Sequence, residues 1–135
     1  MSDFKVSYKG DLSTEIMHLS SGSKILTDAP TDNNGLGRTL SPTDLVASSL
    51  ASCMLTIIAM AANTHSIDIK NMDADVTKIM SKTLPRKISR IDIKLSIIGM
   101  LNDKSKKIIE RSASTCPVHH SLNKDILINL DIKYR

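Results

Sequence analysis

Aromatic residues are almost absent from this chain of 135 residues, and their scarcity excludes one class of function. The chain has no Trp, one Phe (Phe4) and two Tyr (Tyr8 and Tyr134), so its core must be built from Ile, Leu, Val, Met and Ala. Proteins that bind single-stranded nucleic acid stack the bases on aromatic side chains. We therefore expect no base-stacking platform in this protein.

Cysteine is also scarce, with only Cys53 and Cys116, which lie 63 positions apart (116 − 53). Two cysteines exclude a disulfide-rich secreted scaffold and a four-cysteine zinc module. The first ten residues, MSDFKVSYKG, lack the basic and apolar regions of a secretory signal, so we expect a cytoplasmic protein. In a reducing compartment a cysteine pair is more often catalytic, metal-binding or inert than a structural disulfide.

The rest of the composition is that of an ordinary globular protein, with 41% hydrophobic and 24% charged residues. We expect a single domain over residues 1–135. The net charge of +4 is uneven, because residues 1–67 carry four Lys/Arg against six Asp/Glu and residues 68–135 carry fourteen against eight. In the basic half, charged residues such as Arg90, Asp92 and Lys94 alternate with apolar residues, a pattern that is typical of a solvated sheet face. We expect no nucleic-acid partner, since no recognition motif accompanies the charge.

Alternating apolar residues and turn residues predict the regular elements. The expected strands are residues 4–8, Glu15–Leu19, Lys24–Asp28, Ile67–Met80, Ile88–Ile98 and Ile126–Tyr134. The Pro-, Asn- and Gly-rich segment Ala29–Leu40 predicts an exposed loop. Asn102 or Asp103 is expected to cap a helix that ends at Ala113 and buries Ile108 and Ile109.

A short helix over Pro117–Leu122 is expected to follow, with Cys116 as its N-cap and Pro in its first position. The central helix begins after Ser41-Pro42-Thr43-Asp44, where a hydroxyl, a Pro and an acid have the spacing of a capping box. The predicted order is βββ-α-ββ-α-α-β, which is an α+β fold.

The central helix continues through 18 residues, Leu45–Ala62, that carry no charge. That length reaches the threshold for a membrane span, but the stretch is rich in Ala and Ser and has no flanking aromatic or basic anchors. We expect a buried helix and no membrane partner. A domain of this size has difficulty covering such a helix on all sides, so the sequence predicts a homodimer.

The two cysteines differ in their predicted surroundings. Cys116 stands at a helix N-terminus, where free N–H groups and the helix dipole favour the thiolate, the reactive form of cysteine. Cys53 lies beyond the first turn of its helix and would need a cation from elsewhere, for which Arg38, Arg86 and Arg90 are candidates. A free cysteine also often packs as a small apolar residue, and the spacing alone leaves that interpretation open for both.

His119 and His120 follow Cys116 at positions i+3 and i+4, which allows two further hypotheses. The three side chains could hold a metal ion, or a Cys–His pair could act in hydrolysis. Neither has the second ligand pair or the orienting acid that it requires, so we expect no metal and no cofactor. Asp44 could belong to an active site, although helix capping already explains it.

Two motifs together carry a resemblance to a known family: SPTDLVASSLASCM (Ser41–Met54) and CPVHHSL (Cys116–Leu122). With the element order, they resemble the OsmC/Ohr family of osmotically induced protein C and organic hydroperoxide resistance proteins, and in particular its OsmC-like branch. The resemblance implies an intertwined homodimer of α+β subunits, with the central helices packed inside and the active sites at the subunit interface.

The resemblance also implies a thiol-dependent peroxidase that reduces organic hydroperoxides in oxidative-stress defence. Cys53 would be the peroxidatic cysteine, which becomes a sulfenic acid, and Cys116 would resolve it as a disulfide. An external dithiol, lipoyl-bearing or thioredoxin-like, would restore both thiols. Arg38 would activate the Cys53 thiolate and Asp44 would orient that arginine, since Thr43 stands where the family usually carries Glu.

A second hypothesis is a binding protein. The dimer interface, lined by Met54, Met60 and aliphatic residues, would hold a small apolar ligand, and the thiols would only pack or sense redox state.

Overall fold

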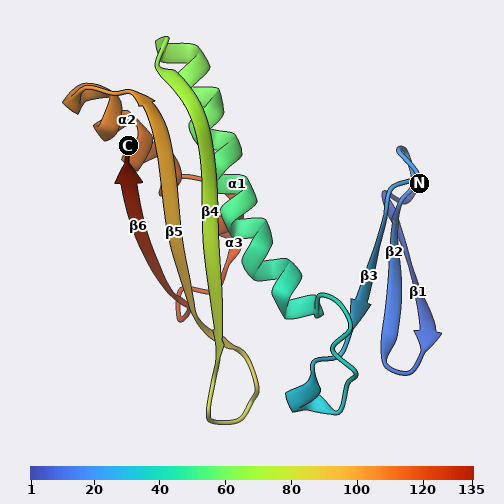
Figure 1. Ribbon diagram of the computed structural model, residues 1–135. Helices are drawn as coiled ribbons and strands as arrows, with labels where there is room; N and C mark the ends of the chain where they lie inside the picture. The colour runs from blue at the N-terminus through green and yellow to red at the C-terminus, as the bar shows by residue number, and fades with distance from the viewer. The chain divides into compact units, whose positions relative to one another are not determined.

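The computed structural model describes all 135 residues, and it divides into two compact units, Met1–Val46 and Ala47–Arg135. The predicted α+β class and the order βββ-α-ββ-α-α-β are confirmed (Figure 1). The one addition is a single 3₁₀ turn, Thr31–Asn33, within the predicted loop. The expectation of one domain over residues 1–135 stays a prediction.

The first unit contains an antiparallel sheet, here called the N-terminal sheet, of strands β1 (Phe4–Gly10), β2 (Ser13–His18) and β3 (Lys24–Asp28) in that order. Strand β2 begins two residues earlier than predicted. The reason is the turn before it, which has only two residues, Asp11 and Leu12, both with positive φ (53° and 60°). Such a turn matches the twist of a tight hairpin, so pairing resumes at once.

One face of the N-terminal sheet is apolar and open. The strand register places Val6 opposite Ile16, and Ile16 opposite Ile25, on the same face as Phe4 and Tyr8. Phe4, Val6 and Tyr8 are 58%, 63% and 66% exposed. Side chains of this kind are normally covered, so the N-terminal sheet has no core on this face.

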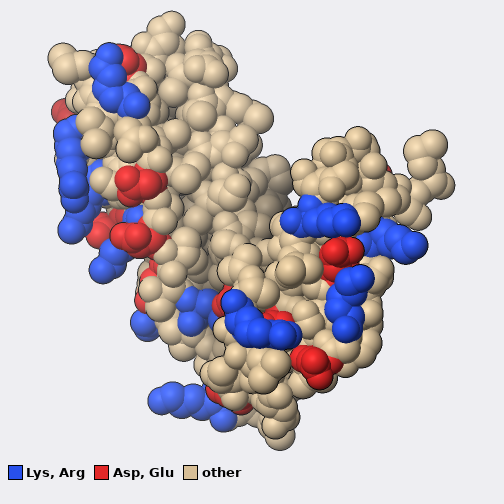
Figure 2. Space-filling model, turned by 45° about the vertical axis from the view of Figure 1, so that its right-hand side comes forward, with Lys and Arg blue, Asp and Glu red and all other residues tan.

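Helix α1 (Pro42–His65) begins where the sequence predicts and continues three residues beyond the uncharged stretch Leu45–Ala62. Its buried residues recur every three or four positions along one side: Ala47, Leu50, Ala51, Met54, Ile58 and Ala62. The opposite side contains exposed Ser, Thr and Met and no charged residue from Leu45 onward. Figure 2 shows that much of the second unit's surface on this side lacks Lys, Arg, Asp and Glu. Judged by length and composition alone, α1 could cross a membrane, a test that the core helix of a soluble protein also passes.

The second unit contains a sheet, here called the C-terminal sheet, of strands β4 (Asp68–Met80), β5 (Ile88–Met100) and β6 (Leu127–Tyr134) in that order. Strand β5 is antiparallel to β4 and parallel to β6. Its inward side chains, Ile91, Ile93, Leu95 and Ile97, are at most 1% exposed. They form one core with the buried side of α1 and with Ile109 and Ala113 of helix α2 (Asp103–Ala113).

The outer face of the C-terminal sheet carries charges of both signs. Lys94 on β5 lies in register between Asp75 on β4 and Asp131 on β6. Arg90 Nη2 donates to Asp92 Oδ2 at 3.0 Å, and Asn129 Nδ2 donates to Asp92 Oδ1 at 2.9 Å. The alternating pattern of basic and apolar residues in this half of the sequence is therefore that of a solvated sheet face, as predicted.

Candidate active site

The two cysteines come from different elements and meet in the core of the second unit. Cys53 lies in the fourth turn of α1, is half-buried, and packs against the core cluster. Cys116 belongs to that cluster and has no exposed surface. Both cysteines are free, and Cys53 packs against the cluster that contains Cys116, near enough to influence the pKa of the Cys116 thiol. The structure thus brings together the two sulfurs that the sequence singled out.

Cys116 is held by the helix that follows it. It is the N-cap of helix α3 (Pro117–Ser121), as predicted, and its Sγ accepts the backbone N–H of His119 at 3.3 Å. Pro117 suits the first helical position because the N–H that it lacks would have no partner there. The sulfur of Cys116 therefore has a defined position at the N-terminus of α3.

Burial is the main influence on Cys116. It raises the pKa of the Cys116 thiol, and the hydrogen bond and charge of Cys53 raise it further, whereas the His119 N–H lowers it. The helix-end effect expected from the sequence is therefore present but is outweighed, because desolvation disfavours the thiolate. From the helix end alone, the sequence predicted a lowered pKa for the Cys116 thiol. The pKa is raised instead, so that prediction was wrong in direction. Cys53 is half-buried and is the more exposed of the two cysteines.

Arg38 pairs with Asp28 in the first unit. Arg38 Nε donates to Asp28 Oδ2 at 2.8 Å and Nη2 donates to Oδ1 at 3.0 Å, while the Arg38 backbone N–H donates to Oδ2 at 2.8 Å. Mainly through the hydrogen bond from Arg38, the pKa of Asp28 falls from 3.8 to about 2. The planar guanidinium fits the carboxylate at two points, so the orientation of Arg38 is defined.

Asp28 was not among the residues selected from the sequence. It ends β3, ten residues before Arg38, and no spacing rule links a strand end to the far side of a loop. The loop brings them together through its own backbone bonds, from the Gly35 N–H to the Pro30 carbonyl (2.9 Å) and from the Gly37 N–H to the Ala29 carbonyl (3.1 Å). A Cβ at Gly35 would collide with the Ala29 carbonyl, so only glycine fits there.

Asp44 forms the predicted capping box. Its N–H donates to Ser41 Oγ at 3.1 Å, and its Oδ2 accepts the Ser41 N–H at 2.9 Å. The carboxylate that holds the Arg38 guanidinium belongs to Asp28. A role for Asp44 in orienting Arg38, and for Arg38 in activating Cys53, stays a prediction.

His119 and His120 do not form a metal-binding group with Cys116. Cys116 Sγ accepts the backbone N–H of His119, and the two imidazole rings stack on each other with centroids 6.2 Å apart. No group of three or more His, Cys, Asp or Glu side chains is placed to hold a metal ion.

Comparison with known proteins agrees with the fold and the motifs. A family model described as "OsmC-like protein" matches residues 35–131. A solved structure from Psychrobacter arcticus 273-4, named for osmotic stress induction and a detoxification response, is 47% identical, with a TM-score of 0.92 over 98% of this chain and 96% of that one. No curated protein matches the sequence.

More distant structures share the fold. An organic hydroperoxide resistance protein OsmC from Legionella pneumophila is 16% identical, with a TM-score of 0.79 over 98% of both chains. An OsmC-like protein from Mycoplasma pneumoniae is 20% identical, with a TM-score of 0.79 over 98% of this chain and 95% of that one. The motifs around Cys53 and Cys116, the strand order and these matches lead to one conclusion: the chain belongs to the OsmC-like protein family.

Proposed function

We propose that this protein is a thiol-dependent peroxidase that reduces organic hydroperoxides to alcohols in oxidative-stress defence. One observation carries the proposal: two free thiols, Cys53 and Cys116, lie at one packed core, near enough for Cys53 to raise the pKa of the Cys116 thiol. The mechanism requires their Cα atoms to lie within about 7 Å, the reach of a disulfide. Structural relatives named for organic hydroperoxide resistance and for a detoxification response support the same class of function.

In the first step the Cys53 thiolate attacks the terminal oxygen of the hydroperoxide. A sulfur–oxygen bond forms and the oxygen–oxygen bond breaks, so that Cys53 is oxidised to a sulfenic acid. The alkoxide takes up a proton and leaves as the alcohol. Cys53 suits this step because it is the more exposed of the two sulfurs.

In the second step Cys116 attacks the Cys53 sulfur. A disulfide forms, and the sulfenic oxygen leaves as water with the thiol proton. Burial suits Cys116 to this role, because a thiol with a raised pKa keeps its proton and does not compete for the peroxide. An external dithiol, lipoyl-bearing or thioredoxin-like, then reduces the disulfide and itself becomes oxidised.

Arg38 is proposed to activate the Cys53 thiolate, with its guanidinium oriented by an acid. The predicted candidate for that acid is Asp44. Asp28 is a second candidate, because it accepts hydrogen bonds from the Arg38 guanidinium. A cation close to a thiolate lowers the pKa of the thiol, so loss of Arg38 should reduce the fraction of reactive sulfur.

The active form is proposed to be a cytoplasmic homodimer. Two features support a second copy as the cover: the open apolar face of the N-terminal sheet and the uncharged, partly exposed side of α1. The first is an apolar surface that a soluble protein normally buries against a partner, and the second is an uncharged surface that a partner could cover at little cost in desolvation.

The test is a peroxide-consumption assay on the wild type and on Cys53→Ser and Cys116→Ser, with Ser52→Ala as a control at an exposed neighbouring position. We expect cumene hydroperoxide to be consumed faster than hydrogen peroxide, and dihydrolipoamide or dithiothreitol to sustain turnover better than a monothiol. Cys53→Ser should lower the rate by at least about 100-fold, while Ser52→Ala stays close to the wild type. Consumption no faster than that of free thiol, with a retained apolar ligand, would favour the binding-protein hypothesis instead.

A further inference from the structure

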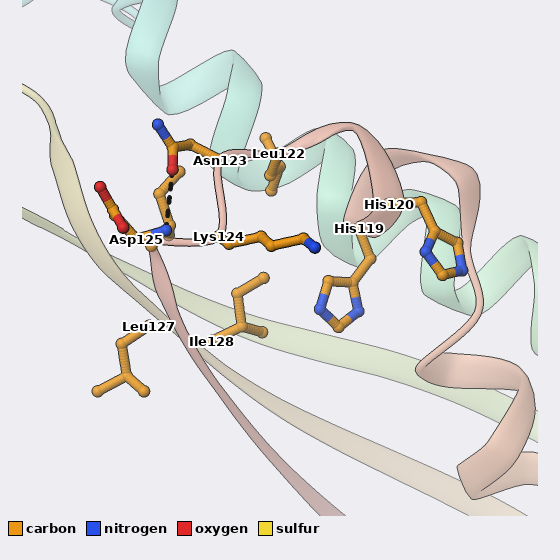
Figure 3. A pocket seen from close by; sticks show the side chains of 9 residues that line it. His119, His120, Leu122, Asn123, Lys124, Asp125, Leu127 and Ile128 are labelled. Carbon is orange, nitrogen blue, oxygen red and sulfur yellow. Dashed lines mark hydrogen bonds between the residues drawn. The ribbon is translucent and has the colours of Figure 1, made fainter.

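A cavity of about 420 Å³ lies between helix α3 and the start of strand β6 in the second unit. Figure 3 shows it with the side chains that surround it, none of which is a thiol. Its volume lies in the range of small-molecule sites. The peroxidase mechanism makes no use of this cavity.

The cavity contains an ammonium group without a carboxylate partner. In Figure 3 the Lys124 side chain extends toward the His119 ring, and the Asp125 carboxylate points away from both. Asp125 Oδ2 instead lies 3.9 Å from Lys87 Nζ. The positive charge of Lys124 is therefore not neutralised by the acid next to it in the sequence.

His119 adds a hydrogen-bond donor. Its Nδ1 is buried and has no hydrogen-bond partner. A proton on that nitrogen would be a buried donor without an acceptor, which costs more than a buried lone pair, so the neutral ring carries its proton on Nε2. His119 lines the cavity and can therefore offer Nε2–H to a ligand.

The walls beside this pair are apolar. Leu122 and Ile128 lie on the two sides of the Lys124 side chain in Figure 3, and Ile126 also lines the cavity. A ligand that satisfies one ammonium and one imidazole N–H while it covers aliphatic side chains has a single negative charge and a hydrocarbon tail. A phosphate fits less well, because its second charge would face only one cation.

We propose that this cavity binds a small aliphatic carboxylic acid, with the carboxylate between Lys124 Nζ and the His119 ring and the hydrocarbon chain along Leu122 and Ile128. No cysteine lines this site, although His119 also donates its backbone N–H to Cys116 Sγ, and the proposal does not rest on the peroxidase function. A carboxylate bound in this way satisfies both donors at once and buries apolar surface of ligand and protein together.

Titration of the full-length protein with hexanoate, followed by NMR of its methyl groups, tests the proposal. We expect saturable shifts at Leu122 and Ile128. Lys124→Met should weaken binding about tenfold, and Lys104→Met, which removes the same charge from an exposed position on α2, should change it by less than about twofold. Hexanamide, which has the same chain without the charge, should bind about tenfold more weakly than hexanoate.

Several results would overturn the proposal. One is the absence of saturable shifts at these methyl groups up to about 50 mM hexanoate, a concentration at which even a millimolar site would be filled. Equal losses in Lys124→Met and Lys104→Met would indicate only a general charge effect. Inorganic phosphate binding as tightly as hexanoate would exclude a site for aliphatic acids.

Discussion

The two sheets of this protein have three strands each, yet only one has its own core. In the C-terminal sheet the four inward residues of β5 are at most 1% exposed, whereas in the N-terminal sheet Val6 is 63% exposed. The difference follows from the segments that connect the strands. In the second unit these segments include helices, which pack against the C-terminal sheet. In the first unit only turns join β1, β2 and β3. The two cysteines lie in the unit that has its own hydrophobic core. The Arg38–Asp28 pair lies in the unit whose sheet leaves an apolar face exposed.

The largest expected effect is on the core of the C-terminal sheet. Leu95→Ala removes a fully buried side chain from β5 and should lower the free energy of unfolding by about 3 kcal/mol, through lost burial and the cavity left behind. The matched control is Leu127→Ala on β6, where the side chain is 55% exposed and the loss should stay below about 0.5 kcal/mol. Urea denaturation measures both, and equal losses would contradict the difference in packing.

The second prediction concerns the open face of the N-terminal sheet. Val6→Asp places a charge where a second copy is proposed to pack, and it should convert a dimer to a monomer, because an unpaired charge in an apolar interface is strongly disfavoured. Ser7→Asp introduces the same charge on the opposite face of β1 and should leave the dimer intact. Size-exclusion chromatography with light scattering measures the mass. A wild type that is already monomeric would contradict the proposed dimer.

The third prediction is a pH dependence of the N-terminal unit. The pKa of Asp28 is lowered from 3.8 to about 2, chiefly by its hydrogen bond with Arg38. A lowered pKa stabilises the fold above the unfolded value, and this contribution is lost as the pH falls through the folded value. The stability difference between wild type and Asp28→Asn should thus be constant above about pH 5 and shrink toward pH 2. Urea unfolding at each pH measures this difference, with Asp32→Asn as the control. A difference between wild type and Asp28→Asn that does not change with pH would contradict the ion pair.

The smallest expected effect is on the edge of the C-terminal sheet. Tyr134 on β6 donates to Glu110 Oε1 at 3.2 Å on α2, and burial together with Glu110 raises the pKa of its phenol to about 12. Tyr134→Phe should cost about 1 kcal/mol and remove the phenol that titrates near pH 12. The wild-type contribution of this phenol should persist below its ordinary pKa of 10.0 and disappear as the pH rises through 12. Tyr8→Phe, in the open sheet, is the control, and an equal loss there would contradict the comparison.

Local patterns predicted most of the fold because each depends on neighbouring residues. The capping box at Ser41 and Asp44, the N-caps at Asn102 and Cys116, and the alternation along β5 all appear where the sequence placed them. The short β1–β2 turn was harder to predict, because a Leu with positive φ is uncommon and Leu12 occupies that position. The boundary of β2 was therefore placed too late.

The candidate site was predictable only in part, because its properties depend on residues far apart in the chain. The sequence identified both thiols and the cap at Cys116, and from the cap alone it indicated an easily ionised sulfur. Burial in the core cluster reverses that direction, and no local pattern reports it. Asp28 escaped selection for the same reason, since only the folded loop brings it to Arg38.

The most direct test of the two-cysteine mechanism is to trap the first oxidised sulfur. Cys116→Ser is treated with one equivalent of cumene hydroperoxide in the presence of dimedone, and peptides are analysed by mass spectrometry, with Cys53→Ser treated in parallel. We predict a sulfenic acid adduct on Cys53 in Cys116→Ser and no comparable adduct on Cys116 in Cys53→Ser. An unmodified Cys53 together with an oxidised Cys116 would contradict the proposed order of the two sulfurs.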